Sequence, residues 1–360
     1  MERILIVRMS ALGDIVHALP VLAALRRAWP AAKVDWIVDE AYAPILTLAE
    51  GLNERVIVRA SASAKATADK PRTATFGRGL GYVHAVRYLR SQKYDAALDL
   101  QGLLKSAVWA RLSGAARVIG FDRAHLREPF AASFYSETVV PLDAPHVIQK
   151  NLSILKALGV PPSAMELPLH PVAAPATTAA VAAAGGARKY AVLNPGAAWP
   201  NKRWPAERFG ALAAQLHART GLPSLVTWGP SERELAEQVI AASNGAAAAA
   251  PPTEIADLAV IMRDAALVVS GDTGPLHIAA AMGTPLVGLY GPTWPERNGP
   301  WDPDDQVISR AGGCVCHHKR QCLRGAPCIN EIEVADVLAA AERRLLSAKP
   351  VPRSLGEGGS

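Results

Sequence analysis

The sequence predicts an α/β protein built from two doubly wound domains that face a cleft. Short apolar runs rich in β-branched residues alternate with helical patterns twice, over residues 3–158 and over residues 190–290. Such runs are typical of buried parallel strands, and their alternation with helices is typical of βαβ units. Between the two series, residues 159–188 are rich in Pro, Ala, Thr and Gly, as linkers are. The length of 360 residues also favours two domains.

In the first half, apolar runs predict strands at residues 3–7, 33–38, 55–58, 96–100 and 118–120. Helical patterns predict helices at residues 15–29, 43–50, 79–92, directly after 101–106, and 146–158. Pro20 should kink the first helix or restart it, because proline lacks a backbone donor. Residues 61–76 lack periodicity and predict a mobile basic loop.

The second half repeats the alternation. Strands are expected at residues 190–193, 224–228, 267–269 and 286–290, and helices at residues 206–219, 232–242, 255–264 and 276–282. We therefore assign residues 1–170 to an N-terminal domain, 171–188 to the linker, 189–348 to a C-terminal domain and 349–360 to a disordered tail.

Basic residues are concentrated in one part of the chain. The net charge is +6, whereas residues 61–127 alone hold twelve Lys or Arg against four Asp or Glu. This concentration indicates an anionic partner, such as nucleic acid, an anionic lipid surface or an acidic small substrate. Nucleic acid is the least favoured, because the segment lacks interleaved aromatic residues for base stacking. The alternative is a basic surface that has no partner and reflects only a high GC content of the coding DNA.

No apolar run is long enough for a transmembrane helix, and the run near the N-terminus is too short for a signal peptide. The chain is therefore expected to stay in the cytoplasm. The cysteines lie together near the C-terminus, unlike the framework of a secreted disulfide-rich protein. They are Cys314, Cys316, Cys322 and Cys328, with His317 and His318 beside them. Their loose spacing is compatible with a structural zinc, which is not favoured, with reduced thiols that pack a loop, or with one disulfide.

The stretch LVVSGDTGPLHIAAAMGTP at residues 267–285 predicts a strand, a turn of small residues and a helix. Such a turn directs free backbone N–H groups and the positive end of a helix dipole at one point, which suits a diphosphate. An ordinary turn with Asp272 as a solvated cap is the alternative reading of the same residues.

Asp14 lies in the turn after the first strand, where an open parallel sheet places its ligands. A carboxylate at this position could accept a proton from a substrate, or it could simply cap the following helix. The chemistry of the residue alone favours the cap.

Two further residues follow strands of the second half. Lys202, in the loop NPGAAWPNKRWP, could bind a diphosphate leaving group or be one of a solvated pair of cations. Glu232 could accept hydrogen bonds from ribose hydroxyls or stabilise the start of a helix through its dipole.

Several of these segments, taken in order, resemble the ADP-heptose:lipopolysaccharide heptosyltransferases of glycosyltransferase family nine, and the type that performs the first heptose transfer most closely. The resemblance spans about residues 3–340. It rests on the segments ILIVRMSALGDIVHALPVLAALRRAWP, VDWIVDE, YDAALDLQGLLKSA, REPFAASFY, NPGAAWPNKRWP, WGPSERE and VVSGDTGPLHIAAAMGTPLVGLYGPT. It implies a GT-B architecture, in which two Rossmann-like domains enclose the active site.

The resemblance also implies an activity. A heptose would be transferred with inversion, and without a metal or other cofactor, from ADP-L-glycero-β-D-manno-heptose to a Kdo sugar of lipid A in the lipopolysaccharide inner core. Contact with the cytoplasmic face of the inner membrane would be peripheral. A relative that uses another donor or core acceptor (the second or third heptosyltransferase type), or a non-catalytic nucleotide-sugar-binding protein, remains the alternative.

Residue roles follow from the same resemblance. Asp14 matches the catalytic base, which overrides the preference for a cap. The donor contacts match Lys202, Glu232, Asp272, Thr273, Gly274 and His277, and the acceptor contacts match Lys105 and Arg127. Residues 61–76 match a mobile acceptor-binding loop. One departure concerns Gly196 and Ala197, which stand where the most similar members carry a Thr-Thr pair.

Overall fold

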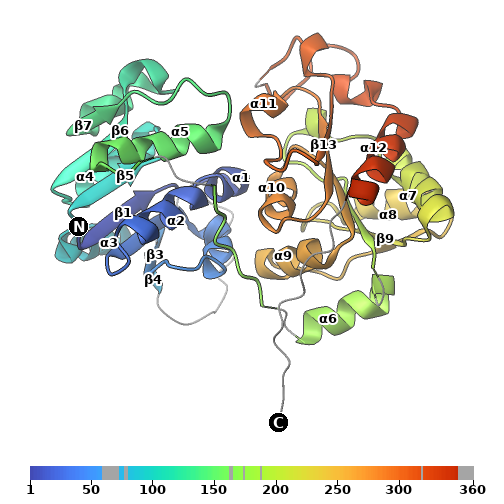
Figure 1. The fold of residues 1–360 in the computed structure, drawn as a ribbon, viewed down its shortest axis with the longest axis horizontal. Helices are drawn as coiled ribbons and strands as arrows, with labels where there is room; N and C mark the ends of the chain where they lie inside the picture. The colour runs from blue at the N-terminus through green and yellow to red at the C-terminus, as the bar shows by residue number, and fades with distance from the viewer. Residues whose placement is uncertain are drawn as a thin grey trace.

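The computed structural model describes residues 1–58, 73–76, 80–161, 165–172, 175–186, 189–317 and 319–347. Two parallel β-sheets lie side by side, each with helices packed on its faces (Figure 1). The expected pair of βα-alternating halves is confirmed. None of the described helices combines the length and the apolar character needed to cross a bilayer.

The described strands of the first sheet follow the order β4-β3-β2-β1-β5-β6-β7, and all neighbours are parallel. The strand order reverses at β1, so a crevice opens beyond the carboxyl ends of β1 and β5. The strands are β1 (Arg3–Val7), β2 (Lys33–Asp39), β3 (Glu54–Val58), β4 (Thr73–Phe76), β5 (Ala96–Asp99), β6 (Arg117–Phe121) and β7 (Glu137–Val139).

The described strands of the second sheet follow the order β10-β9-β8-β11-β12-β13, again parallel throughout. Its order reverses between β8 and β11, which places a second crevice opposite the first. The strands are β8 (Ala191–Asn194), β9 (Ser224–Val226), β10 (Ala247–Ala249), β11 (Leu267–Gly271), β12 (Leu286–Tyr290) and β13 (Gln306–Ser309).

Helices connect these strands. In the first half they are α1 (Leu12–Val16), α2 (Leu19–Ala28), α3 (Leu80–Gln92), α4 (Leu104–Leu112) and α5 (Val147–Ser153), with 3-10 segments η1 (Glu40–Thr47), η2 (Arg123–His125), η3 (Pro129–Phe134) and η4 (Ile154–Leu158). In the second half they are α7 (Ala206–Thr220), α8 (Arg233–Ala241), α9 (Ile255–Asp264), α10 (Gly274–Ala281), α11 (Pro295–Asn298) and α12 (Val334–Ser347), with 3-10 segments η6 (Pro200–Lys202), η7 (Ala311–Gly313) and η8 (Cys328–Glu331). The stretch expected as a linker contains α6 (Pro175–Val181) and a π-helical turn, η5 (Ala182–Gly186).

Several expected elements differ from the structure. The first helix restarts as expected, because Pro20 lies in the first turn of α2, but α1 begins at Leu12 and so includes Asp14. The helix expected at residues 43–50 is the 3-10 segment η1, which contains Pro44. Residues 73–76 form strand β4 rather than part of a loop, and residues 61–72 lie outside the described residues.

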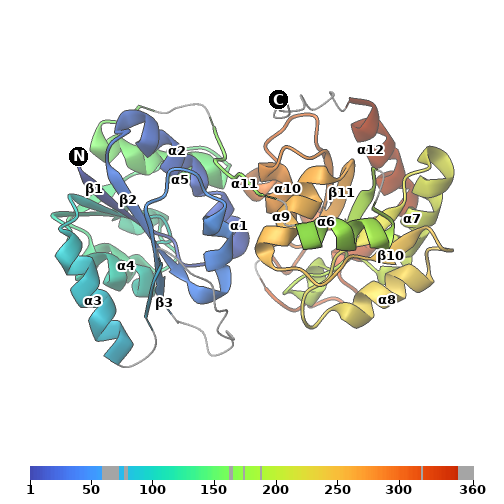
Figure 2. The same cartoon turned by 90° about the horizontal axis from the view of Figure 1, so that it is seen from below.

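The two halves pack together through an apolar region. A single cluster of buried side chains includes Ile6 and Trp36 from the first half and Ile261 and Ile278 from the second. Figure 2 shows α1 facing α9 and α10 across the junction. This packing keeps the two crevices facing each other.

Candidate active site

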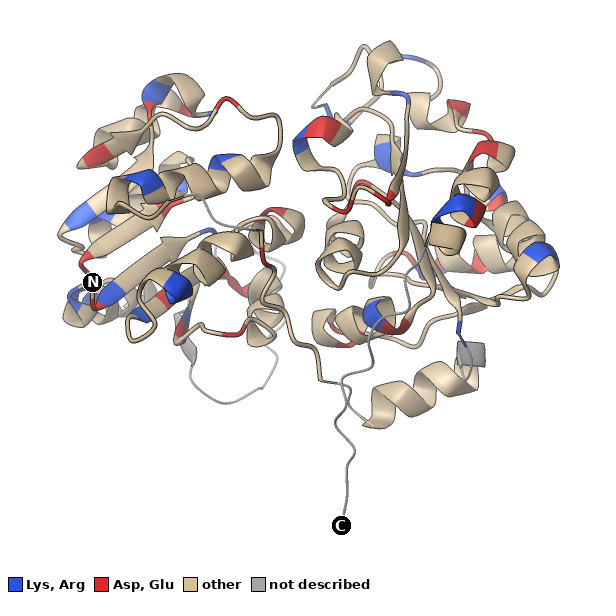
Figure 3. Ribbon diagram, in the orientation of Figure 1, with Lys and Arg blue, Asp and Glu red and all other residues tan. Residues whose placement is uncertain are grey.

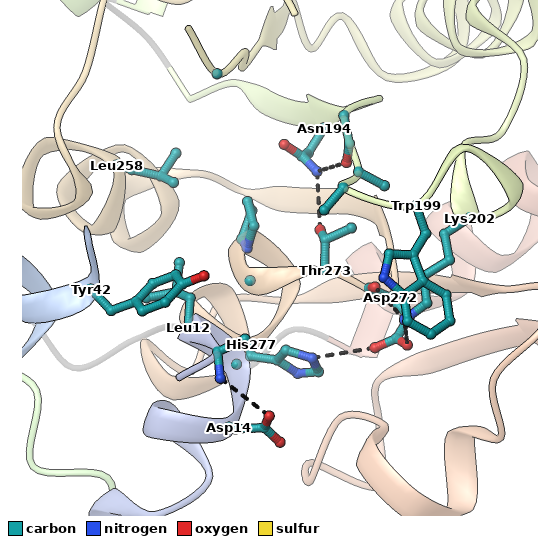
Figure 4. Close-up of a pocket in the computed structure, with 18 of the residues that line it drawn as sticks. Leu12, Asp14, Tyr42, Asn194, Trp199, Lys202, Leu258, Asp272, Thr273 and His277 are labelled. Carbon is teal, nitrogen blue, oxygen red and sulfur yellow. Dashed lines mark hydrogen bonds and ion pairs between the residues drawn. The ribbon is translucent and has the colours of Figure 1, made fainter. Parts of the chain in front are cut away.

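A cavity of about 950 Å³ lies between the two halves and is lined by both. Figure 4 shows side chains from α1 on one wall and from the ends of β8 and β11 on the other. The lining includes nearly all of the residues singled out from the sequence, namely Asp14, Arg127, Lys202, Glu232, Asp272, Thr273, Gly274 and His277. Of the expected catalytic, donor and acceptor residues, Lys105 alone does not line it.

Asp14 occupies the third position of α1. Its Oδ2 accepts a hydrogen bond from the Ala11 amide (3.3 Å), so it does help to cap its own helix. Its Oδ1 lies 2.8 Å from Nη2 of Arg8, whose side chain is almost fully buried. About a third of the Asp14 side chain (33 %) remains exposed, toward the cavity. The carboxylate therefore keeps acceptor positions for a bound molecule.

Two arginines control the charge of Asp14. Burial raises its pKa, but attraction to Arg8 and Arg297, together with hydrogen bonds from the Ala11 amide and Arg8, holds the pKa below the ordinary value of aspartate. Arg297 belongs to α11 of the second half and also lines the cavity. Asp14 is therefore an ionised carboxylate at neutral pH, able to accept a proton.

Asp272, at the end of β11, is buried within a set of donors from four other places in the chain. Its Oδ2 lies 2.5 Å from Lys202 Nζ and accepts from Thr293 Oγ1 (2.7 Å). Its Oδ1 accepts from Asn298 Nδ2 (2.6 Å) and lies 3.3 Å from His277 Nε2. Burial raises its pKa, but the bonds and charges of His277 and Lys202 hold the pKa well below its usual range. The solvated cap considered from the sequence is wrong, because Asp272 is buried and ionised.

Lys202 faces the cavity from η6. Its Nζ lies 5.0 Å from the centre of the Trp199 ring and also donates to the Asp272 carbonyl (3.3 Å). The side chain is only 16 % exposed, so the alternative of a solvated cation is wrong. The Asp272 carboxylate and the Trp199 ring hold the ammonium in one place, where an anionic group in the cavity could meet it.

The start of α10 forms part of the cavity wall. Thr273 is the N-cap residue and Gly274 and Pro275 begin the helix, so the Gly274 and Leu276 amides have no helical partners. Asn194, at the end of β8, donates to Ser270 Oγ (3.0 Å) and Thr273 Oγ1 (3.3 Å). The predicted strand-turn-helix is confirmed, and Asn194 joins it to the neighbouring strand.

Glycines bring the two walls into direct contact. A Cβ atom on Gly13 of α1 would lie 2.2 Å from His277 Cδ2, and one on Gly274 of α10 would lie 2.6 Å from Leu12 Cδ2. Neither position has room for a side chain. The glycines therefore let α1 and α10 approach closely beside the cavity.

Glu232 also lines the cavity. Its Oε2 accepts from the Gly229 amide (3.1 Å), and its Oε1 lies 3.5 Å from Arg203 Nη2. A Cβ atom on Gly196 would lie 2.1 Å from Glu232 Oε2. The Glu232 carboxylate therefore occupies the space that a side chain at residue 196 would need, which explains why glycine and not threonine fits at this position.

Three histidine rings lie next to one another, and two of them, His17 and His277, line the cavity. The rings of His17 and His277 are 4.4 Å apart between centroids, and those of His17 and His146 are 5.7 Å apart. His146 Nδ1 accepts from the Ile148 amide (3.2 Å), so Nε2 donates to the Gly299 carbonyl (3.1 Å) and the ring is neutral. Burial lowers the pKa of His146, and burial together with repulsion from His277 and His146 lowers that of His17 strongly.

The two expected acceptor contacts occupy different places. Arg127 lines the cavity, whereas Lys105 lines a separate groove on the first half and donates from Nζ to Ser10 Oγ (3.5 Å). Figure 3 shows Lys and Arg positions in both halves. Of the twelve basic residues at 61–127, Lys65, Lys70, Arg72 and Arg78 lie outside the described residues.

The structure gathers the four cysteines into one cluster of free thiols. The Sγ atoms of Cys314 and Cys316 are 3.7 Å apart, and those of Cys316 and Cys322 are 3.3 Å apart. Burial and the neighbouring thiols raise the pKa of Cys328 to about 12. Among the described residues, no group of His, Cys, Asp and Glu is arranged to hold a metal ion.

Sequence reasoning missed several residues that shape the cavity. Arg8 directly follows β1, so the same strand-end argument that selected Asp14 could have selected it. Arg297, Thr293 and Asn298 lie in and beside the short helix α11, for which the sequence offers no periodic signal. Only the fold brings them to Asp14 and Asp272.

The chain is similar in sequence to known proteins. Residues 83–326 match the model of glycosyltransferase family 9 (heptosyltransferase). The chain is 30 % identical over 322 residues to lipopolysaccharide heptosyltransferase 1 of Pseudomonas aeruginosa (89 % of this chain, 87 % of that protein). It is 29 % identical over 344 residues to lipopolysaccharide heptosyltransferase 3 of Escherichia coli (93 % and 97 %).

A solved structure of the E. coli heptosyltransferase WaaC with ADP superposes with a TM-score of 0.73 at 25 % identity, and covers 95 % of this chain and 99 % of that chain. This match confirms the GT-B architecture that the resemblance implied.

Proposed function

Because the chain belongs to glycosyltransferase family 9, we propose that it transfers heptose from ADP-L-glycero-β-D-manno-heptose to a Kdo sugar of lipid A, with inversion at the anomeric carbon. One observation carries this proposal. An ionised carboxylate on one half, Asp14, and a held ammonium on the other, Lys202, line the same cavity. A transferase of this kind needs a base at the acceptor and a cation at the leaving group.

The proposed step is a direct displacement. The acceptor hydroxyl attacks the anomeric carbon of the heptose, and the bond from that carbon to the diphosphate oxygen breaks as the new glycosidic bond forms. Asp14 takes the hydroxyl proton. The departing ADP gains negative charge, which Lys202 and the amides at the start of α10 would stabilise. Neither a metal nor another cofactor enters this step.

The remaining roles divide between the two halves. On the donor side, Glu232 would accept from the ribose hydroxyls, while Thr273, Gly274 and His277 would contact the diphosphate and the heptose. Asp272 would act mainly by holding Lys202 and His277, because both of its oxygens already accept from protein donors. On the acceptor side, Arg127 and Lys105 would meet the anionic groups of Kdo and lipid A.

The identity of the acceptor is the most specific part of the proposal. Relatives named heptosyltransferase 1 and heptosyltransferase 3 are about equally similar to the chain. We favour the Kdo acceptor because the segments of the first half, from ILIVRMSALGD to REPFAASFY, resemble the first type. A lipid-linked acceptor would also place the enzyme at the cytoplasmic face of the inner membrane, in peripheral contact.

A transfer assay tests the proposal. The enzyme is incubated with ADP-heptose and Kdo₂-lipid A, and the products are resolved by mass spectrometry. We expect one added heptose and free ADP. Transfer only to a core that already carries heptose would assign a later step of the pathway, and ADP-heptose binding without any transfer would indicate a non-catalytic binding protein.

A further inference from the structure

Helix α4 carries apolar side chains on two faces. Its inner face, made of Ala107 and Ala110 with the small polar Ser106 beside them, is completely buried against the first sheet. A second stripe, Leu104, Val108 and Leu112, recurs every fourth residue and is not fully buried, with Leu104 40 % exposed. A helix on the surface of a soluble protein normally carries polar residues on its outer face. The second stripe therefore needs another explanation.

This stripe forms one wall of a groove of about 780 Å³ between α3 and α4. Tyr82 and Val86 of α3 form the other wall, and Trp109 of α4 meets Tyr82 edge to face, with ring centroids 5.7 Å apart. Figure 2 shows the two helices side by side on the first half, away from the junction with the second. Of the described residues that line the groove, only Lys105 and Glu128 are charged.

The two charged residues lie at the same end of the groove. Glu128 Oε2 accepts from the Leu104 amide (2.7 Å) at the start of α4, so its charge is used in capping the helix. Lys105 Nζ donates to Ser10 Oγ (3.5 Å), and Ser10 precedes Ala11, which lines the active-site cavity. The apolar groove thus begins beside the acceptor wall of the cavity, with a cation where the two meet.

We propose that this groove binds an acyl chain of the acceptor lipid. The proposal rests on the proposed transfer to a lipid-linked sugar. These surfaces match an amphiphile with an anionic head and apolar chains. The head would lie in the cavity with Asp14 and Arg127, its anionic groups would meet Lys105, and an acyl chain would lie between the apolar walls of α3 and α4. The groove volume lies in the range of cavities that bind a small apolar ligand. Burial of only two methylene groups there changes affinity by about tenfold.

The first test compares acylated with fully deacylated Kdo₂-lipid A as acceptors. We expect the wild-type kcat/KM to be about tenfold or more higher for the acylated acceptor. Val108→Glu places a charge in the groove and should remove this preference while turnover of the deacylated acceptor remains. Val83→Glu is the control, because Val83 is an exposed valine of the neighbouring helix α3 (46 % exposed) that does not line the groove.

Equal kcat/KM for both acceptors in the wild type would overturn the proposal. A loss of preference in both variants would overturn it too, because it would indicate general adsorption of this face to lipid.

A second measurement does not depend on turnover. A dodecanoyl chain brominated near its end should quench tryptophan fluorescence in the wild type, and Trp109→Phe should remove most of the quenching. Quenching that depends on Trp109, together with no transfer to either acceptor, would support acyl binding in the groove and reject the proposed function. Transfer without acyl preference and without this quenching would reject acyl binding in the groove and support the proposed function.

Discussion

The His277 ring lies directly against the backbone of Gly13, so the two halves of the molecule touch where a single methyl group would not fit. A Cβ on Gly13 would lie 2.2 Å from His277 Cδ2. Gly13 precedes Asp14, and His277 contacts Asp272. This contact therefore sets the separation between the two cavity walls that we propose bind the acceptor and the donor.

Gly13→Ala should lower kcat by about 10- to 100-fold, because an added methyl group forces α1 and α10 apart and misplaces Asp14. ADP affinity should change little, since the donor wall belongs to the second half. Steady-state kinetics and calorimetric ADP titration measure the two effects. Gly312→Ala is the control, because a Cβ there meets nothing within 4 Å. An unchanged kcat in Gly13→Ala would contradict this role of the contact.

Asp14→Asn should lower kcat by about 10²- to 10⁴-fold, because an amide cannot take the proton of the acceptor hydroxyl. The variant keeps the shape of the side chain, so ADP should bind as in the wild type. Single-turnover transfer and ADP titration separate the two properties. Turnover at the wild-type rate would show that another group acts as the base.

Lys202→Met should destabilise the fold by about 3 kcal/mol, because it leaves the buried Asp272 carboxylate without its cation. Asp272→Asn removes that charge, so the double variant should recover part of the loss. Urea unfolding of the wild type and the three variants gives the coupling free energy. Additive effects of the two changes would show that the ion pair contributes nothing. ADP affinity should fall in both variants that lack Lys202.

Gly196→Thr should destabilise the protein by about 1–3 kcal/mol, because its side chain would occupy the space of the Glu232 carboxylate. In a Glu232→Ala background the same change should cost distinctly less. A double-mutant cycle from chemical denaturation measures the difference. If the cost is the same in both backgrounds, the two residues do not compete for space.

His17 should make the protein sensitive to mild acid. Burial, then repulsion from His277, His146 and Arg8, holds its pKa well below the ordinary histidine value of 6.5, although Asp272 opposes the shift. The unfolded chain takes up a proton near that value and the folded protein does not. Stability is therefore complete above pH 6.5 and falls as the pH drops below it, by up to about 1.4 kcal/mol per pH unit.

The test compares the free energy of unfolding at about pH 7.5 and about pH 5.5 in the wild type and in His17→Phe. The wild type should lose about 1 kcal/mol more than the variant over this interval. His217→Phe, at an exposed histidine of α7, is the control and should behave as the wild type. Equal losses in the wild type and His17→Phe would assign the acid sensitivity to other groups.

The sequence predicted the central strands well and the edge strands poorly. β1, β11 and β12 are apolar runs that each face helices on both sides, so their pattern alone identifies them. β10 is a run of alanines and β7 has only three residues, and neither pattern differs from a loop. Pairing with β9 and β6 makes them strands, and such pairing is not visible in a local segment.

The candidate site divides in a similar way. Asp14 lies in the first helix after strand β1, and Asp272 directly follows strand β11, so fold topology alone placed them near a crevice. Neither the Arg8 and Arg297 charges around Asp14 nor the Thr293 and Asn298 bonds to Asp272 follow from any motif. These contacts join residues that are distant in the sequence, and only the folded chain brings them together.

Asp272 accepts from Lys202, His277, Thr293 and Asn298, which belong to separate segments of the second half. The side of the cavity that we propose binds the donor is therefore preorganised before any nucleotide arrives. The conformational entropy of these side chains is lost during folding and not during binding. The entropic cost of binding a nucleotide is therefore smaller, and its affinity is higher. The donor should thus bind to a preformed site rather than by induced fit.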